Sequence, residues 1–280
     1  MAGAVRHQSG ESPPGRCLHE PARSYPILAP DAAGEESLTA RITAQLEIIM
    51  NSLFSPINRD LSGLHVLVTA GPTHEAIDPV RYIGNHSTGK MGYAVADVLA
   101  ERGATVTLVS GPTNLTAQHH AITVIRVRSA AEMYEACLDY FPTASITVLA
   151  AAVADYTPKV VANRKIKKQE TAFMLELVRT VDIAASLGQQ KSDDQFMVGF
   201  ALETDNELAN AQAKLVSKNL DLIVLNSLRD EGAAFGHDTN QITILHRDGG
   251  IHRFGLKAKR EVARDIVDEI IVALNTAHLN

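Results

Sequence analysis

Residues 81–92 combine more potential chemistry than any other stretch of this chain. They read RYIGNHSTGKMG, follow an apolar segment, HVLVTA at 65–70, and run into a predicted helix at 88–102. A glycine-bearing loop between a strand and a helix directs backbone N–H groups and the positive end of the helix dipole into the loop. Phosphate suits such a place best, so phosphate binding is our first hypothesis.

Two polar side chains in this loop could act on a substrate. The Asn85 amide offers two donors and an acceptor without charge, which suits a carbonyl or a developing oxyanion. Arg81 could hold a phosphate or a carboxylate through two parallel hydrogen bonds. The alternatives are that Asn85 caps the helix or supports the loop and that Arg81 is a surface charge. Lys90, near the start of the predicted helix, could be functional or simply solvated.

Two common nucleotide-binding motifs nearly fit this region, and each fails at a defined position. From Gly84 the spacing G-x4-G-K matches a P-loop, but the next residue, Met91, has no hydroxyl for magnesium. A Rossmann fingerprint would follow the first strand directly, whereas GPT at 71–73 opens a long insertion. We therefore expect an enlarged strand-to-helix crossover, with room for side chains that reach a substrate as well as a nucleotide.

A second candidate group follows the apolar strand predicted at 146–151. The chain reads AAAVADY at 150–156, and small residues at the carboxyl end of a strand let a ligand approach the backbone closely. Asp155 then provides a carboxylate where nucleotides bind in such folds, for a magnesium ion or a ribose hydroxyl. The alternative is an aspartate that caps a helix or braces a loop.

Lysines mark a third candidate group. Three of them fall within 165–168, in a segment at 157–180 that lacks a helical period and resembles a hairpin-like flap over the site. Like charges so close repel one another unless a polyanion such as a triphosphate neutralises them, although a solvated loop is the alternative. Lys214 and Lys218 lie one turn apart on a predicted helix, where they could hold a nucleotide or face solvent.

Alternating strands and helices surround these groups. Parallel strands joined by helices predict a doubly wound sheet with its ligand at the carboxyl ends of the strands. We therefore predict an α/β fold with a mostly parallel Rossmann-like sheet, the flap and a C-terminal β-hairpin. The predicted strands cover 65–70, 104–109, 122–127, 146–151, 196–201 and 220–225, the helices 88–102, 130–140, 182–188, 206–218 and 258–274, and the hairpin 241–254.

Composition divides the chain and excludes some partners. Residues 1–36 are rich in Gly, Ser, Pro and Glu, so we expect them to be disordered or loosely attached, followed by an amphipathic helix and linker at 37–61 and one domain at 62–280. A net charge of −6 provides no basic face for nucleic acid. Two cysteines, no bilayer-length apolar run and no secretory signal make a cytoplasmic protein the default expectation.

Taken together, these segments resemble phosphopantothenoylcysteine synthetase, the ligase half of the bacterial bifunctional enzyme of coenzyme A synthesis. The resemblance extends from about residue 62 to the C-terminus. One matching block would carry little weight, whereas several in order are specific. The blocks are VTAGPT at 68–73, DPVRYI at 78–83, NHSTGKMG at 85–92, AAVADY at 151–156, KIKK at 165–168 and NLDLI at 219–223.

The resemblance implies a ligation in two steps. CTP first activates the carboxylate of 4'-phosphopantothenate as an acyl-cytidylate and pyrophosphate leaves, because a carboxylate is too poor an electrophile for an amine. The amine of L-cysteine then attacks the activated carbonyl and gives the amide and CMP.

The resemblance also implies roles for individual residues. The expected catalytic residues are Lys165, for forming the intermediate, Asn85, for the second step, and Arg81, for the anionic substrate. Arg81, Asn85 and Ala151 are the expected substrate contacts, and Asp155 is the expected ligand of Mg²⁺. The implied nucleotide contacts are Leu149, Ala150, Ala151, Asp155, Lys165, Val181, Asp182, Ile183, Ala184, Phe200, Lys214 and Lys218.

The bifunctional enzymes carry a flavin-dependent decarboxylase ahead of the ligase. The roughly sixty residues that precede the resemblance here are too few for a domain of that kind. We therefore expect no FMN and no decarboxylation. A homodimer is a further expectation from the family, with the hairpin at 241–254 as a candidate contact.

Two other functions compete with this interpretation. A short-chain NAD(P)-dependent oxidoreductase should carry a Tyr-x-x-x-Lys pair, but Tyr82 and Tyr156 are followed four residues later by His86 and Val160. A non-catalytic nucleotide-binding subunit is the other rival. The retained catalytic candidates argue against it, and an assay would decide.

Overall fold

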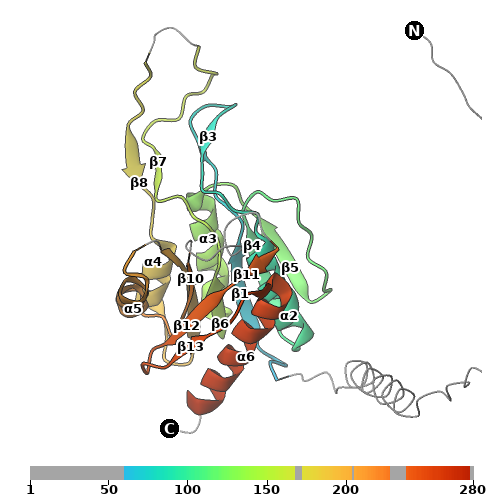
Figure 1. Ribbon diagram of the computed structural model, residues 1–280. Coiled ribbons are helices and arrows are strands. Elements are labelled where there is room, and N and C mark those ends of the chain that lie inside the picture. The colour runs from blue at the N-terminus through green and yellow to red at the C-terminus, as the bar shows by residue number, and fades with distance from the viewer. Residues whose placement is uncertain (1–59, 168–171, 204, 228–237, 278–280) are drawn as a thin grey trace, which may run out of the picture. The chain divides into compact units, whose positions relative to one another are not determined.

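The computed structural model describes residues 60–167, 172–203, 205–227 and 238–277 (Figure 1). The chain divides into two compact units, Met1–Ser55 and Pro56–Asn280, and all described residues belong to the second. Three predictions lie outside the described residues: those for 1–36, for 37–59 of the predicted helix and linker, and for residue 168.

An eight-stranded sheet forms the centre of the second unit. Its parallel strands are ordered β5-β4-β1-β6-β9-β10, which is the doubly wound Rossmann order, so the predicted fold class is confirmed. The winding reverses between β1 and β6, and ligands bind beyond the carboxyl ends of strands at such a point. Antiparallel β12 and β13 extend the sheet beyond β10 as the predicted hairpin. The strands are β1 His65–Ala70, β4 Thr105–Ser110, β5 Ile122–Arg126, β6 Ile146–Leu149, β9 Phe196–Glu203, β10 Leu222–Ser227, β12 Ile242–His246 and β13 Ile251–Arg253.

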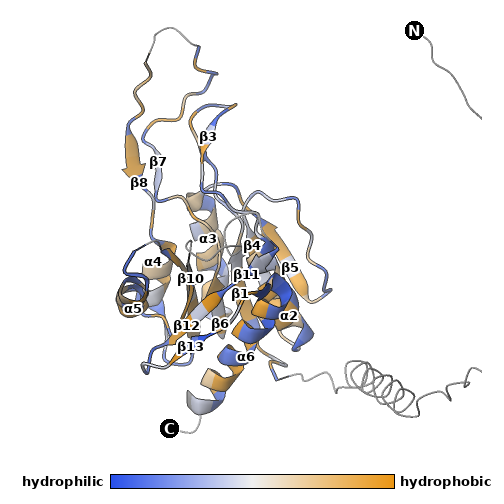
Figure 2. Cartoon of the chain, viewed as in Figure 1, coloured by the Kyte–Doolittle hydropathy of each residue, from blue (hydrophilic) through white to orange (hydrophobic). Residues whose placement is uncertain are grey.

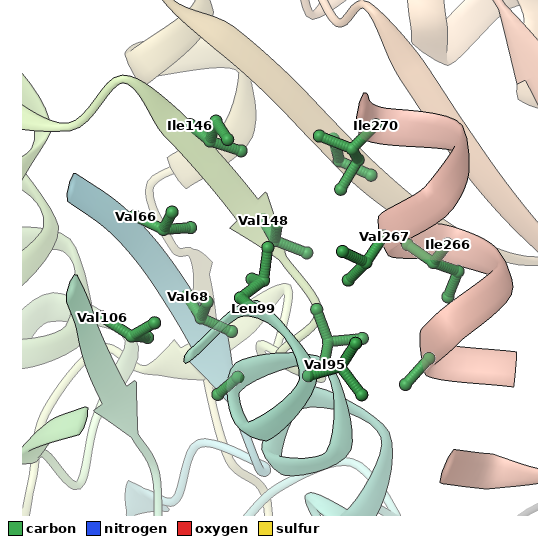
Figure 3. Close-up of a cluster of buried hydrophobic side chains, with 14 of the residues drawn as sticks. Val66, Val68, Val95, Leu99, Val106, Ile146, Val148, Ile266, Val267 and Ile270 are labelled. Atoms are coloured by element: carbon green, nitrogen blue, oxygen red, sulfur yellow. The ribbon is translucent and has the colours of Figure 1, made fainter. Parts of the chain in front are cut away.

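Helices cover both faces of the sheet because strand side chains alternate in direction. Val66 and Val68 of β1 pack with α2 and α6, as Figure 3 shows, whereas Leu67 packs with α3, α4 and α5. Each such buried side chain contributes about 1.5–3 kcal/mol relative to an exposed one. None of the described helices is both long and apolar enough to span a bilayer. The helices are α2 Lys90–Glu101, α3 Ala130–Tyr140, α4 Ile183–Gln190, α5 Glu207–Ser217 and α6 Lys259–Ala277, with a 3-10 turn, η1, at Phe141–Thr143.

Short antiparallel pairs stand outside the main sheet. In the flap, which we define as residues 157–180, the ends form a hairpin, as predicted, and this hairpin stands apart from the sheet in Figure 1. The N–H of Ala162 in the flap donates to the carbonyl oxygen of Ile77 at 3.0 Å, which joins the flap to the crossover insertion. The pairs are β7 Tyr156–Pro158 with β8 Leu177–Arg179, β2 Glu75–Ala76 with β3 Tyr82–Ile83, and β11 Thr239–Asn240 with β14 Lys257–Ala258.

The start of α2 is fixed by two glycines. Gly89 is its N-cap, with a left-handed φ of 77°, so the helix begins at Lys90, two residues later than predicted. Gly92 lies against β1, because a Cβ at this position would be 2.6 Å from the Cβ of Ala70. The N-terminus of α2 therefore lies directly beyond the carboxyl end of β1, where the topology favours a ligand.

Candidate active site

A cavity of about 540 Å³ lies at the carboxyl-end side of β1, β6 and β9. We call it the α4 cavity, because the first residues of α4 line it together with Lys214 of α5 and Lys218 at the end of that helix. All predicted nucleotide-binding residues line this cavity except Ala150 and Lys165. Segments that are far apart in the sequence therefore meet here.

Backbone forms part of the wall of the α4 cavity, and threonine side chains hold that backbone in place. The hydroxyl of Thr69 accepts a hydrogen bond from the N–H of Ala151 at 3.2 Å, and the hydroxyl of Thr73 accepts one from Ala154 at 3.0 Å. The hydroxyl of Thr180 donates to the carbonyl oxygen of Ala154 at 2.7 Å. Because Thr69 and Thr73 are buried, a ligand would meet a preformed surface.

The two lysines of the α4 cavity are paired with carboxylates. Lys214 Nζ lies 2.6 Å from Glu203 Oε1, and Lys218 Nζ lies 3.0 Å from Asp182 Oδ2. Asp182 also caps α4 by accepting from the N–H of Ala185 at 3.0 Å. Burial alone would raise the pKa of Asp182, but the hydrogen bonds from Ala185 and Lys218 hold it below its ordinary value. A polyanion entering this cavity would therefore compete with carboxylates for both ammonium groups.

Asp155 meets the requirements for a magnesium ligand beside a nucleotide. It is exposed and lines the α4 cavity, and its carboxylate has no hydrogen-bond or ion-pair partner within the described part of the chain. Mg²⁺ in nucleotide sites is usually held by one or two carboxylates together with phosphate oxygens and water. The Asp155 carboxylate fits such an ion, because it is open to the cavity and leaves room for phosphate oxygens and water around the metal.

A second cavity of about 570 Å³ adjoins the first. We call it the α2 cavity, because residues 85–92 at the start of α2 line it. The two cavities share Ala151, Val153, Phe200 and Lys214. They therefore meet at the carboxyl end of β6, and groups bound in each would face one another across a common wall.

The α2 cavity has the character of an anion site. Lys90, Lys214 and Lys259 line it together with the N-terminus of α2, whose dipole also favours negative charge. Lys90 Nζ lies 2.5 Å from Asp238 Oδ1, so it is not simply solvated. Burial, and then the neighbouring Lys90, lower the pKa of Lys259, while Asp238 opposes the shift. An anionic ligand in this cavity would add a negative charge to that of Asp238 and would relieve the repulsion between Lys90 and Lys259.

Asn85 lies at the junction of the two cavities. It lines the α2 cavity, and its Nδ2 donates to the carbonyl oxygen of Val153, a residue of the shared wall, at 2.8 Å. No side chain caps α2, whose N-cap is Gly89, so the helix-capping alternative for Asn85 does not hold. The amide is therefore available beside the place where the two ligands would meet.

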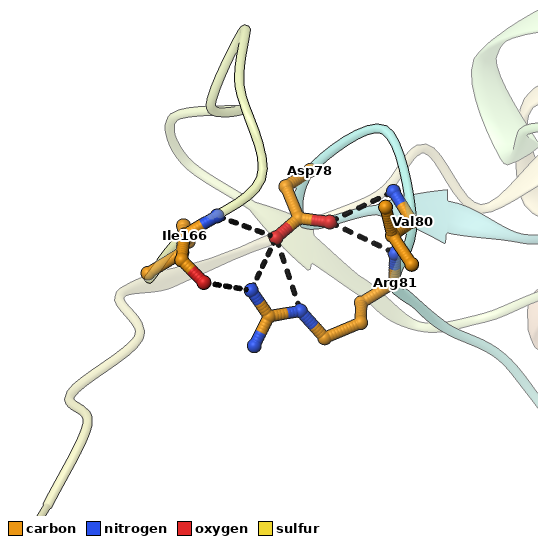
Figure 4. A network of polar contacts seen from close by, with 4 residues as sticks. All are labelled: Asp78, Val80, Arg81 and Ile166. Atoms are coloured by element: carbon orange, nitrogen blue, oxygen red, sulfur yellow. Dashed lines mark hydrogen bonds and ion pairs between the residues drawn. The ribbon is translucent and has the colours of Figure 1, made fainter. Parts of the chain in front are cut away.

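Arg81 and Lys165, by contrast, line neither cavity. Arg81 donates to the Asp78 carboxylate from Nε at 3.0 Å and from Nη2 at 2.5 Å, and the same Nη2 donates to the carbonyl oxygen of Ile166 at 2.8 Å (Figure 4). Ile166 returns a hydrogen bond from its N–H to Asp78 at 3.1 Å. We call these contacts the flap latch, because they tie the flap, next to Lys165, to the crossover insertion.

The flap latch centres on a buried carboxylate. The side chain of Asp78 is fully buried, whereas that of Arg81 is 45% exposed. The Arg81 guanidinium, helped by backbone N–H groups of Ile166, Val80 and Arg81, holds the pKa of the Asp78 carboxyl well below its usual range, although burial opposes this. Asp78 is therefore ionised at neutral pH, and the charged side chain of Arg81 is committed to it.

Several site residues were not anticipated from the sequence. Asn226 and Asn240 line the α2 cavity and are joined by a hydrogen bond of 3.2 Å from Nδ2 of Asn240 to Oδ1 of Asn226. Asn226 lies near the carboxyl end of β10, so the rule that ligands bind at strand ends could have found it. Lys259 is the first residue of α6, and no local pattern links it to residues 85–92.

The chain matches a known family over most of its length. Residues 61–274 match the DNA/pantothenate metabolism flavoprotein C-terminal domain. A prokaryotic protein named cysteine/cysteine sulfinic acid decarboxylase is 52% identical over 217 residues, which are 78% of this chain and 60% of that protein. The coenzyme A biosynthesis bifunctional protein CoaBC of Bacillus subtilis (strain 168) is 43% identical over 256 residues, which are 91% of this chain and 62% of that protein.

A solved structure agrees with this relationship. The crystal structure of the C-terminal domain of a coenzyme A biosynthesis bifunctional protein CoaBC superposes with a TM-score of 0.67 at 41% identity, and the match covers 78% of this chain and 99% of that one. The chain spans about three fifths of the length of the two full-length relatives above. Its similarity therefore concerns the C-terminal domain.

Proposed function

Because the chain belongs to the DNA/pantothenate metabolism flavoprotein C-terminal domain family, we propose that it is a ligase that joins 4'-phosphopantothenate to L-cysteine. CTP would supply the activation, through an acyl-cytidylate, and leave as CMP and pyrophosphate. The observation that carries this proposal is the pair of adjoining cavities with a shared wall at Ala151, Val153, Phe200 and Lys214. Such a pair suits a reaction between a nucleotide and a second anion.

The nucleotide would occupy the α4 cavity. The preformed backbone at Ala151 and the start of α4 would contact the base and sugar, while Lys214 and Lys218 would exchange their carboxylate partners for phosphate oxygens. Mg²⁺, when bound at Asp155 and the phosphates, would reduce the negative charge that an attacking carboxylate meets. The α-phosphate would lie near the shared wall.

The acid substrate would occupy the α2 cavity. Its phosphate would lie against the N-terminus of α2 with Lys90 and Lys259, and its carboxylate would extend to the shared wall, where it meets the α-phosphate. The oxygen of the carboxylate then attacks phosphorus, the bond to the pyrophosphate oxygen breaks, and the acyl-cytidylate forms. Holding both groups against one wall removes most of the entropy cost of their encounter.

Asn85 would act in the second step. When the cysteine amine attacks the acyl carbon, the carbonyl oxygen becomes an oxyanion, and the Asn85 amide can donate a hydrogen bond to it from the junction of the cavities. The tetrahedral intermediate then collapses, the bond to CMP breaks, and the amide forms. A neutral donor suits this step because it binds the carboxylate of the acid substrate only weakly, so its hydrogen bond can stabilise the tetrahedral intermediate more than the ground state.

Lys165 would act in the first step through a movement of the flap. Its ammonium would stabilise the charge that develops on the transferring phosphorus and the leaving pyrophosphate. In the described conformation it is exposed and outside both cavities, and the flap latch holds the neighbouring Ile166. We propose that Arg81 supports this reaction by positioning the flap, in addition to any contact with the anionic substrate.

We also propose a homodimer in the cytoplasm. The earlier candidate contact, the hairpin at 241–254, exposes Ile251. Exposed apolar side chains are more numerous on the flap and the adjoining β3, and Figure 2 shows the apolar β8 there. These side chains favour the flap as the contact between copies. They are Tyr82, Val160, Val161, Phe173, Met174, Leu177 and Val178. Analytical ultracentrifugation of Phe173→Asp and of Ile251→Asp would show which substitution turns the dimer into a monomer, and therefore whether the flap or the hairpin forms the contact.

One assay tests the proposed reaction. The chain is mixed with 4'-phosphopantothenate, L-cysteine, Mg²⁺ and either CTP or ATP, and pyrophosphate and the amide product are measured. We expect CTP-dependent pyrophosphate release that requires 4'-phosphopantothenate, and amide only when cysteine is present. If neither nucleotide gave pyrophosphate, the ligase proposal would be wrong and a nucleotide-binding subunit would be favoured.

A second assay addresses the name of the relative with 52% identity. That name denotes loss of CO₂ from cysteine or cysteine sulfinate, whereas the cavities described here suit two anions that react with each other. We expect no CO₂ from either amino acid with this chain. Release of CO₂ without nucleotide would favour decarboxylation as its activity.

A further inference from the structure

Two histidines and a glutamate converge at the edge of the sheet, away from both cavities. His246 ends β12, His252 is on β13, and Glu269 is on α6, which lies beside this hairpin in Figure 1. One potential ligand atom from each residue lies within 4.8 Å of the other two. In the part of the chain that the structure describes, no other three such residues of the His, Cys, Asp and Glu types come as close.

The backbone fixes the positions of these side chains. The N–H of His246 donates to the carbonyl oxygen of Gly250 at 2.8 Å, which closes the turn between the strands. His252 is paired with Ile244 in the ladder between β12 and β13, so its side chain lies close to that of His246, with ring centroids 5.0 Å apart. Glu269 reaches both rings from the helix. The three groups are thus held by three separate elements.

The polar contacts within this cluster are incomplete. Glu269 Oε1 lies 2.8 Å from Nδ1 of His252, which is a hydrogen bond. The other pair, Nε2 of His246 and Oε2 of Glu269, lies 3.0 Å apart, which is close enough for an ion pair when the imidazole is protonated, but it is not aligned for a hydrogen bond. Both of these atoms are buried, and neither has a hydrogen-bond partner among the described residues. Buried polar atoms without a partner are costly, so these two atoms point to a ligand between the three side chains.

We propose that His246, His252 and Glu269 bind one divalent transition-metal ion, of which Zn²⁺ is the best match. Two imidazole nitrogens and one carboxylate form a common ligand set for Zn²⁺, with water in the fourth position. The side chain of His252 is 53% exposed, which leaves a path for the ion and space for that water. Mg²⁺ would not compete, because it prefers oxygen ligands in an octahedral arrangement.

The ion would have a structural role rather than a catalytic one. His246 pairs with Leu222 at the start of β10, whereas Ile242, at the other end of β12, pairs with Asn226 of the α2 cavity. The metal would therefore lie at the end of the strands opposite the cavities. It would join α6, which supplies both core residues and Lys259, to the hairpin at the edge of the sheet.

Metal binding to the whole chain tests this proposal. The chelator-treated protein is titrated with Zn²⁺ in buffer that contains Mg²⁺, and heat and thermal unfolding are recorded. We expect one equivalent bound per chain and, at a hundredfold excess over the dissociation constant, a rise in Tm of roughly 5–10 °C. His252→Ala and Glu269→Gln should weaken binding by roughly 100-fold or more.

A matched control separates this site from other surface histidines. His120 is exposed and stacks on His119, far from this cluster in the sequence, so His120→Ala should leave Zn²⁺ binding unchanged. Circular dichroism without metal shows whether each variant is folded, and Co²⁺ provides a second readout through the visible absorption of a nitrogen-ligated ion. The proposal is overturned if the folded wild type takes up no Zn²⁺, or if folded His252→Ala binds as tightly as wild type.

Discussion

The α4 cavity and the flap both carry lysines, but the two regions hold these side chains in different ways. Lysines of the cavity are carried by α5, paired with carboxylates, and lie beside backbone that buried threonines hold in place. Lys165 lies on the flap, whose described residues join the crossover insertion through the flap latch and one further backbone hydrogen bond, from Ala162. In the proposed reaction, the nucleotide would therefore bind to a preformed surface of the sheet, whereas Lys165 would be delivered by a segment whose described residues make few contacts with the rest of the domain.

The largest expected effect is on the flap side of this comparison. Lys165→Gln should reduce pyrophosphate release by roughly 10²–10³-fold, because a charged donor to the transition state is lost, while nucleotide affinity changes little. Single-turnover pyrophosphate measurements and nucleotide titrations would show this. Lys159→Gln is the matched control, since Lys159 is on the same flap and pairs with Glu176 at its exposed surface. Normal accumulation of acyl-cytidylate in Lys165→Gln would contradict the role assigned to this residue.

The next effect separates the two steps at the junction of the cavities. Asn85→Asp should leave pyrophosphate release largely intact but reduce amide formation by roughly 100-fold, because a carboxylate repels the oxyanion that the amide stabilises. Rapid quench with labelled nucleotide would measure both products. Equal loss of both steps would mean that Asn85 supports binding or structure instead.

A smaller effect is expected when the flap latch is weakened. Asp78→Asn removes the charge that holds Arg81 and should slow pyrophosphate release by roughly 10-fold, because the latch anchors the flap beside the cavities and a flap without this anchor would bring Lys165 to them less often. Limited proteolysis within the flap should become faster in the same variant. If proteolysis were unchanged, the latch would not control the flap.

The latch also has a defined pH dependence. The pKa of Asp78 is lowered by folding, so its contribution to stability is present above the pKa of an unfolded aspartate, about 3.9, and is lost as pH falls through the lower folded value. Wild type should therefore be more stable than Asp78→Asn at neutral pH, and the difference should shrink only below about pH 4. Urea denaturation of both proteins from pH 7 to pH 3 would measure it. A difference that did not change with pH would show that the charge of Asp78 is not the cause.

An effect of about the same size as that of Asp78→Asn, but on binding rather than on rate, concerns one lysine of the α4 cavity. Lys218→Met should raise the KM for CTP by roughly 10-fold with little change in kcat, because a charge-assisted contact to the nucleotide is lost while Lys214 remains. Steady-state kinetics with varied CTP would show the change, and Lys159→Met should behave as wild type. A fall in kcat without a change in KM would move Lys218 from nucleotide binding to the chemical step.

The sequence by itself predicted the sheet and the flap hairpin, because apolar periodicity determines which segments become strands and helices. It also placed Asp155 at the carboxyl edge of the sheet, because parallel strands bring their carboxyl ends to one edge. Most of the other residues that line the α4 cavity were expected only from the resemblance to a known family. Asp155 follows the end of β6 and Asp182 is the N-cap of α4, so the proximity of these two residues follows once the elements are known.

Only the tertiary structure decided which polar side chains pair across long stretches of chain. The latch between Asp78 and Ile166 spans 88 residues, and the contact of Lys90 with Asp238 spans 148. The cluster of His246, His252 and Glu269 likewise depends on how α6 packs on the hairpin. No local pattern encodes these contacts, because their distances depend on the packing of several elements at once. Packing therefore determined that Arg81 would hold the flap and that Asn85 would face the junction of the two cavities.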